Sequence, residues 1–187
     1  MISGLLLAAG AGSRMGRPKA LVHDPDGTSW LRRSIDVLHA GGCTDVLVVP
    51  GARADEARAL LPDGVRVVVA DDWADGMAAS LSAGLLALGS ADAGEAAVIT
   101  LVDLPDVTAE VLARVAAGAD ASTLRRATYD GRPGHPVLAG RDHWAPMASG
   151  LTGDQGAKTY LAAHGCARVE CGDLATGVDQ DTPHAGR

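Results

Sequence analysis

Three glycines, two arginines and a lysine follow a short apolar run near the N-terminus, in residues 5–21, LLLAAGAGSRMGRPKAL. Backbone N–H groups of a glycine-rich loop bind anions, most often phosphates. Arg14 offers a planar fork to two oxygens, whereas Lys19 is a mobile point charge. The loop therefore predicts a phosphate site in which both cations bind the ligand and stabilise charge on a leaving group.

Two common phosphate motifs do not fit this loop. In the dinucleotide pattern GxGxxG, Met15 stands where the third glycine belongs, and the next predicted strand ends in Val49 and Pro50 without an acidic residue. The Walker A pattern fails because no glycine precedes Lys19 and alanine follows it. The alternative is a strand–helix turn that merely contains glycines, which leaves Arg14 and Lys19 unexplained.

An aspartate ends the apolar run at 96–102. Asp103 lies in TLVDLPD, residues 100–106. An acid at the carboxyl end of a parallel strand lies where open α/β sheets bind ligands. Mg²⁺ prefers one or two carboxylates together with phosphate oxygens and water. The position predicts Asp103 as a Mg²⁺ ligand, the alternative being a cap at the end of the strand.

Composition restricts the class of protein. The 187 residues carry a net charge of −7, which argues against a broad nucleic-acid surface. The three cysteines, an odd number without a CxxC pair, favour reduced thiols over a disulfide framework or a zinc site. No cationic segment precedes the first apolar stretch, and Gly10 ends it early, so we expect a cytoplasmic protein without a signal peptide or membrane span.

Apolar runs alternate with helical patterns through the first part of the chain. The patterns predict strands at 3–9, 45–51, 65–70 and 96–103, and helices at 29–42, 54–61, 76–89 and 108–118. Near-continuous apolar strands separated by helices are typical of a parallel sheet covered on both faces.

The alternation of strand and helix patterns ends after residue 120. Residues 122–140 predict a hairpin excursion near the sheet edge, with its turn at Asp130 and Gly131, in which Arg125 and Arg126 form an exposed pair. A helix at 153–165, a strand at 167–172 and a closing loop at 176–183 complete the chain. The expected fold is α/β, a Rossmann-like three-layer sandwich with a mostly parallel central sheet, in a single domain over residues 1–187.

The opening loop, in the form LAAGxGSRMGxPK, closely resembles the signature loop of the nucleotidyltransferases that build molybdenum cofactor dinucleotides, within the sugar-nucleotide transferase superfamily. Its Ala-Ala-Gly version resembles the cytidylyl branch more than the guanylyl branch. Further stretches similar to family motifs are DDWADGMAASLSAGL (71–85), TLVDLPD, RPGHPVLAG (132–140), TGDQGAK (152–158) and VDQDTP (178–183). The resemblance therefore extends over nearly the whole chain.

The resemblance implies a role for particular residues of this sequence. The implied nucleotide site comprises Leu7, Ala8, Ala9, Gly10, Gly12, Ser13, Arg14, Lys19, Gly76 and Ser80. Asp103 and Asp181 would hold the metal, with Asp179 as an alternate ligand. His135 and Asp154 would face the acceptor, the alternatives being a structural hydrogen bond for His135 and a helix N-cap for Asp154.

The implied reaction is nucleotidyl transfer: a phosphate of the acceptor attacks the α-phosphate of an NTP, and pyrophosphate leaves. The expected substrates are CTP and molybdopterin, with Mg²⁺ as cofactor. Three alternatives remain open. One is an NAD(P)H-dependent oxidoreductase of the nicotine-blue type, whose Gly-His-Pro-x-Leu run is similar. The others are a nucleotide-binding regulator without turnover, and a transferase acting on a sugar or polyol phosphate.

Overall fold

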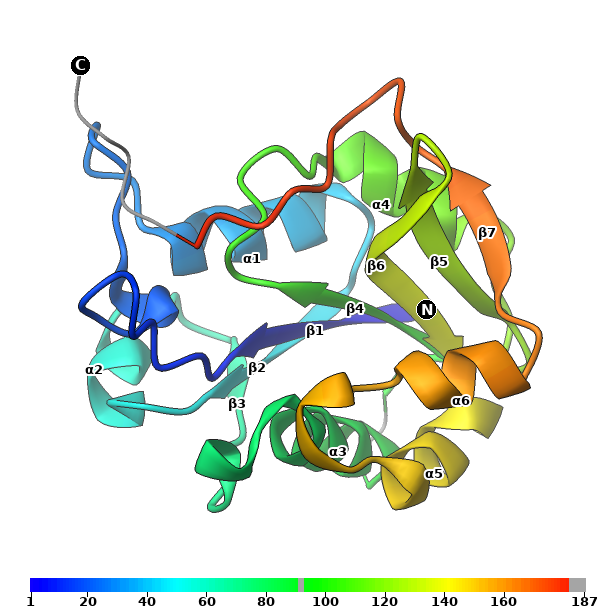
Figure 1. Cartoon of the computed structure of the whole chain (residues 1–187), viewed down its shortest axis with the longest axis horizontal. Helices are drawn as coiled ribbons and strands as arrows, with labels where there is room; N and C mark the ends of the chain where they lie inside the picture. Colours follow the sequence, from blue (N-terminus) through cyan, green and yellow to red (C-terminus); the bar gives the residue numbers. More distant parts are fainter. Residues whose placement is uncertain (91–92, 182–187) are drawn as a thin grey trace.

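In the computed structural model, which describes residues 1–90 and 93–181, seven strands form one sheet (Figure 1). They are β1 (Ile2–Ala8), β2 (Asp45–Pro50), β3 (Arg66–Val67), β4 (Ala96–Leu101), β5 (Leu124–Tyr129), β6 (Arg132–Gly140) and β7 (Ala167–Glu170). Their spatial order is β3-β2-β1-β4-β6-β5-β7, and β6 alone runs antiparallel to its neighbours. The prediction of a mostly parallel α/β sheet is confirmed.

Helices cover both faces of the sheet. They are α1 (Trp30–Ala40), α2 (Ala54–Ala59), α3 (Met77–Gly89), α4 (Ala109–Ala116), α5 (Arg141–Gly150) and α6 (Lys158–Ala163). Side chains alternate along β1, so Leu6 packs in a core with α1 and α4, whereas Leu5 packs in a second core with α3 and α5. This two-sided burial explains the continuous apolar sequence of the central strands.

The predicted hairpin is built into the main sheet. Asp130 and Gly131 form its turn with φ values of 50° and 75°, the positive values that tight hairpins favour. β6 pairs with β4, with Ile99 opposite Val137, and β5 pairs with β7. Burial of Val137 and its neighbours explains why the hairpin extends the sheet instead of standing apart from it.

The structure differs from the predicted helices and strands in three places. α5 was not predicted, because Pro146 interrupts the helical pattern of its sequence and few of its residues are buried. The helix expected at 153–165 is divided into a 3₁₀ turn, η3 (Gly153–Gln155), and α6. The third strand is shorter than expected, since β3 spans Arg66–Val67 alone.

Residues 171–181, here called the C-terminal strap, return from β7 toward the end of β4 (Figure 1, red). The backbone N–H and the hydroxyl of Thr176 both donate to the Asp106 carboxylate at 2.6 Å. The N–H of Gln180 donates to the carbonyl of Asp103 at 2.9 Å. The strap is therefore anchored beside the segment that follows β4; the remainder of the predicted closing loop, residues 182–183, lies outside the described residues.

In the part of the chain that the structure describes, no helix combines the length and the apolar character that crossing a bilayer requires. The extent of a single domain over residues 1–187 stays a prediction.

Candidate active site

The opening loop and Asp103 lie at the same edge of the sheet. β1 and β4 are parallel neighbours with Leu7 opposite Leu101, so their carboxyl ends coincide. Val102 continues the ladder by donating its N–H to the carbonyl of Leu7 at 3.2 Å. The ligand-binding edge expected of an open α/β sheet therefore carries both predicted features.

The loop leaves backbone amides available for a ligand. Two internal bonds shape it: the N–H of Met15 donates to Gly12 at 2.8 Å, and that of Lys19 donates to Gly10 at 3.2 Å. In contrast, within the described residues the N–H groups of residues 11–14 donate to no protein acceptor. Gly12, with φ of 61°, is required here because a Cβ atom would lie 1.9 Å from the carbonyl oxygen of Arg17.

A charge cluster joins three distant parts of the chain. Lys19 Nζ donates to the carboxylate of Asp103 and, at 2.6 Å, to that of Asp181. Arg14 donates to the same Asp181 carboxylate at 2.5 Å. Burial lowers the pKa of Lys19, but the hydrogen bonds that it donates to Asp103 and Asp181, together with their negative charges, outweigh burial and raise the pKa above its ordinary value. The hydrogen bond from Lys19 lowers the pKa of Asp181, so both groups stay charged at neutral pH.

Three carboxylates at this edge have the chemistry of a divalent metal site. One oxygen each from Asp103, Asp179 and Asp181 lies within 4.8 Å of the others. Carboxylate oxygens are hard donors, which suit Mg²⁺ or Mn²⁺. Asp103 is 7% exposed at the base of the cluster, while Asp179 and Asp181 come from the strap. The donor set fits the metal that the sequence resemblance implies.

A cavity of about 380 Å³ opens between this cluster and the N-terminus of α3. Its lining includes seven of the predicted residues, namely Leu7, Ala9, Gly10, Lys19, Gly76, Ser80 and Asp103. The hydroxyl of Ser80, which is 2% exposed, has no hydrogen-bond partner among the described residues. An unpaired buried hydroxyl facing a cavity is a candidate contact for a ligand.

Four predicted residues of the nucleotide site do not line this cavity: Ala8, Gly12, Ser13 and Arg14. The side chain of Ala8 packs in the core under α1, because alternate residues of a strand face opposite sides. Gly12, Ser13 and Arg14 belong to the loop beyond the cavity wall. Sequence reasoning missed Trp73 and Met77, which do line the cavity. Both residues lie within three positions of Gly76 in the sequence, and this proximity could have identified them.

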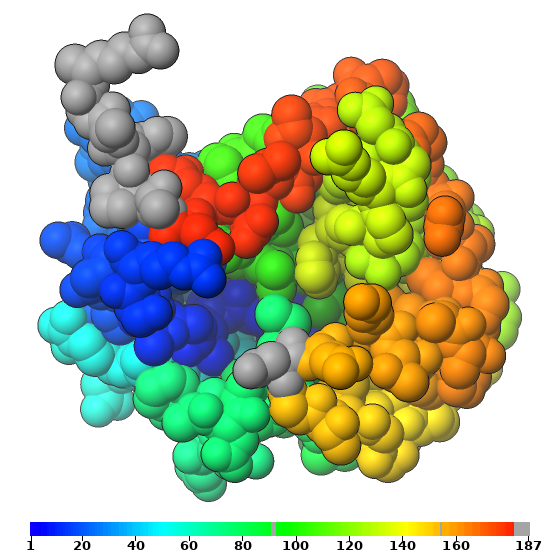
Figure 2. Space-filling view, in the orientation of Figure 1, coloured from blue at the N-terminus to red at the C-terminus, as the bar shows by residue number. Residues whose placement is uncertain are grey.

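Figure 2 shows the hollow between the opening loop (blue), the strap (red) and the segment around α6 (orange). A second cavity, also about 380 Å³, is lined by His135 together with Arg126 and Lys158. Burial and the nearby charge of Arg126 lower the pKa of His135 to about 4, although Asp179 opposes them. The side chain of Asp154 lies outside what the structure describes, so its predicted acceptor contact remains a prediction.

Residues 4–169 match the profile of the MobA-like NTP transferase domain. The chain belongs to the MobA-like NTP transferase family. Among characterised sequences, it is 34% identical to a nicotine blue oxidoreductase of Paenarthrobacter nicotinovorans over 97% of this chain and 92% of the relative. It is 35% identical to a probable molybdenum cofactor guanylyltransferase of Rhodopirellula baltica, over 58% of this chain and 51% of that one.

The fold of this chain is similar to the folds of solved structures. Rv0371c from Mycobacterium tuberculosis superposes with a TM-score of 0.81 at 29% identity, covering 97% of this chain and 92% of that one. A nucleotidyl transferase from Methanothermobacter gives a TM-score of 0.80 at 27% identity, with the same two coverages of 97% and 92%. Another structure of the mycobacterial protein is described as a complex with manganese. Family and neighbours together support a nucleotidyltransferase enzyme.

Proposed function

We propose that this enzyme transfers CMP from CTP to the terminal phosphate of molybdopterin and releases pyrophosphate. The observation that carries the proposal is the meeting of Lys19, Asp103 and Asp181 beside the amides of residues 11–14, which have no acceptor among the described residues. The choice of CTP rests on the Ala-Ala-Gly sequence of the loop, and the choice of acceptor rests on family resemblance.

The loop amides and the side chains of Arg14 and Lys19 bind the triphosphate. An oxygen of the acceptor phosphate forms a bond to the α-phosphorus, and the bond from that phosphorus to the oxygen bridging to the β-phosphate breaks. The departing pyrophosphate keeps that oxygen and its electrons. Its growing charge is stabilised by Arg14 and Lys19. The attacking phosphate is already ionised at neutral pH, so the reaction requires no general base.

Asp103 and Asp181, with Asp179 beside them, would hold a divalent cation, Mg²⁺ in our proposal. A cation bound there supplies positive charge to the reacting phosphates. Lys19 bridges the carboxylates of Asp103, 84 residues further along the chain, and of Asp181, 162 residues further along. In the proposed reaction its charge would bind phosphate oxygens of the triphosphate.

The test is pyrophosphate release by the purified protein with Mg²⁺, molybdopterin and either CTP or GTP. We expect product with CTP, and loss of activity by at least about a hundredfold in Lys19→Ala and Asp103→Ala, since each removes a charged contact to the reacting groups. Arg32→Ala, which removes an exposed cation of α1 that lines neither the first nor the second cavity, is the control. Absence of pyrophosphate with every nucleotide would contradict the proposal.

The oxidoreductase alternative is favoured by one observation, the 34% identity to a nicotine blue oxidoreductase. The same preparation tests it: oxidation of NADH or NADPH by a nicotine-derived pigment, without pyrophosphate release, would favour that activity. Transfer to a sugar or polyol phosphate instead of molybdopterin would preserve the chemistry and change the acceptor.

A further inference from the structure

The second cavity adjoins the first. Leu7 and Met77 line both, so a ligand in one lies next to a ligand in the other. Its apolar wall is formed by Leu81, Ile99, Val137 and Leu161. This apolar wall fits the flat or aliphatic body of a small molecule, and a few polar groups at such a site decide its orientation.

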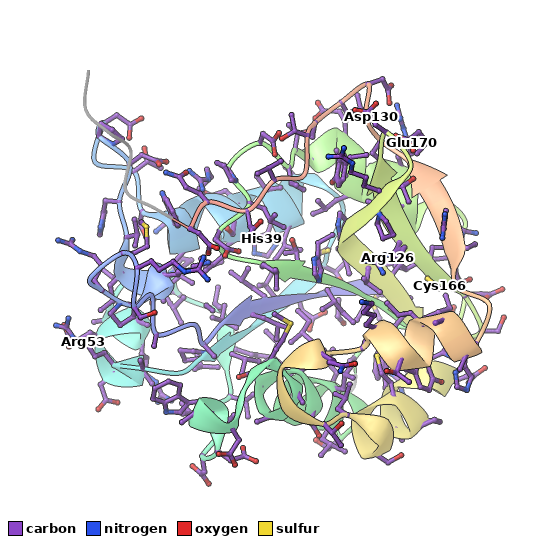
Figure 3. All side chains as sticks on the ribbon, in the orientation of Figure 1. His39, Arg53, Arg126, Asp130, Cys166 and Glu170 are labelled. Atoms are coloured by element: carbon purple, nitrogen blue, oxygen red, sulfur yellow. The ribbon has the colours of Figure 1, made fainter. Side chains whose placement is uncertain are left out.

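Among the described residues of this cavity, Arg126 has a buried hydrogen-bond donor without a partner. It projects from β5, and Figure 3 shows it between the β5–β6 part of the sheet and α6. One Nη donates to the carbonyl of Gly134 at 3.2 Å. Its Nε is buried and has no hydrogen-bond partner, and no carboxylate of the described residues forms an ion pair with Arg126. A buried donor without a partner is unfavourable unless a ligand supplies the acceptor.

The surroundings of Arg126 add positive charge. Lys158 lines the same cavity, and no acidic residue is found among its described lining residues. Burial of Arg126 lowers its pKa, and the charge of Arg168 acts in the same direction. The guanidinium nevertheless stays charged at any physiological pH. Among the described residues, the cavity therefore combines an apolar wall with a cation that has no acidic partner.

We propose that Arg126 is a specificity-determining residue that binds an oxyanion, a carboxylate or a phosphate, of the second substrate. The inference rests on the proposed function for the identity of that substrate as an acceptor. The oxyanion accepts hydrogen bonds from Nε and from an Nη of Arg126, and the apolar body of the substrate lies on Leu81 and Val137. The proposed acceptor is therefore a small molecule that carries both an oxyanion and an apolar group.

The neighbouring Arg125 provides a matched control. Because successive side chains of a strand point to opposite faces, Arg125 lies away from the cavity. Its guanidinium donates to the carbonyl of Ala117 at 2.6 Å, just after α4. Arg125→Met therefore removes the same charge from the same strand without touching the cavity.

The experiment measures binding without turnover. The probes are phenyl phosphate, benzoate and the neutral benzyl alcohol, titrated by NMR into wild type, Arg126→Met, Arg126→Gln and Arg125→Met. We expect at least one anionic probe to bind wild type and Arg125→Met about tenfold or more tighter than the alcohol, because a charge-assisted hydrogen bond has that strength. The better anion identifies the group recognised. Both Arg126 variants should lose the preference, and the glutamine variant serves if the methionine variant does not fold.

An equal preference in the folded Arg126 variants would overturn the proposal, since the anions would then bind elsewhere, for instance at the opening loop. Equal affinity of all three probes for wild type would overturn it as well. A failure of nucleotidyl transfer leaves these affinities unchanged, so the two proposals fail separately. Where transfer is observed, Arg126→Met should raise the KM of the acceptor about ten- to a hundredfold and leave the KM of CTP unchanged.

Discussion

At the scale of single residues, Lys19 has the most consequential environment. It forms ion pairs with carboxylates that lie 84 and 162 residues further along the chain. Lys19 thus bridges two carboxylates from distant parts of the chain. The same side chain would bind the triphosphate in the proposed reaction.

Ser80 should contribute to nucleotide binding. Its buried hydroxyl faces the first cavity without a partner, so a base placed there gains one neutral hydrogen bond. We expect Ser80→Ala to weaken CTP binding about three- to tenfold, measured by calorimetry. Ser82→Ala, on the same helix but outside the cavity lining, should leave the affinity unchanged. Equal affinities for all three proteins would instead make Ser80 a helix-packing residue.

His135 should make stability depend on pH. Its pKa is about 4 in the folded protein against 6.5 when unfolded, so below pH 6.5 the unfolded chain takes up a proton that the folded protein does not. The contribution to stability is present above pH 6.5 and is lost as the pH falls toward 4, by at most about 3 kcal/mol. Urea unfolding at pH 7 and pH 5 should show a smaller pH effect in His135→Gln than in wild type. Parallel pH profiles for the two proteins would refute this assignment.

At the scale of elements, the strap and the hairpin depend on each other. The Tyr129 ring packs beneath Gly177 and donates its hydroxyl hydrogen to the carbonyl of His135 at 2.6 Å. On the far side of the hairpin, the Glu170 carboxylate accepts from the N–H groups of Asp130 and Gly131, which fixes the turn (Figure 3). The hairpin thus forms the surface over which the strap reaches the three clustered carboxylates.

Replacing Gly177 should displace the strap. With φ of 63°, it has a left-handed conformation, and a Cβ atom there would lie 2.0 Å from the Tyr129 ring. We expect Gly177→Ala to reduce pyrophosphate release about tenfold or more and to raise the metal concentration needed, because Asp179 and Asp181 lose their position. Gly165 has the same φ of 63° with no atom within 4 Å, so Gly165→Ala separates backbone strain from the clash. Equal losses in both variants would count against a positioning role of the strap.

At the scale of the whole molecule, the sheet determines which distant segments meet. β1 and β4 are neighbours, so the opening loop lies beside Asp103, and the strap closes over both from the opposite end of the chain. A nucleotide bound at this edge would therefore contact segments from both ends of the chain and from its middle.

Ligand binding should stabilise the fold as a whole. Nucleotide and metal bind the folded state alone, so CTP with Mg²⁺ at about a hundred times the Kd adds about 2.7 kcal/mol, or a rise in Tm of several degrees. We expect EDTA to abolish the rise, and Asp103→Asn to show little of it, in a thermal melt followed by fluorescence. A rise that persists in EDTA would contradict metal-dependent nucleotide binding.

The sequence alone determined the class of fold and predicted the phosphate-binding chemistry of the opening loop. Glycines, cations and an apolar strand lie within a few residues there, and alternating strand and helix patterns are local signals. Sequence motifs also identified Lys19, Asp103, Ser80 and His135 as candidate site residues.

Only the tertiary structure decided which candidates meet. Arg126 was expected to be an exposed member of a pair, and the structure places it half-buried in a cavity because the hairpin joins the sheet next to β4. Ala8 was expected to frame the base through its main chain, which stays a prediction, and its side chain faces the core under α1. Strand order, register and the path of the strap fix these neighbours through contacts between residues far apart in the chain, and no local sequence pattern records them.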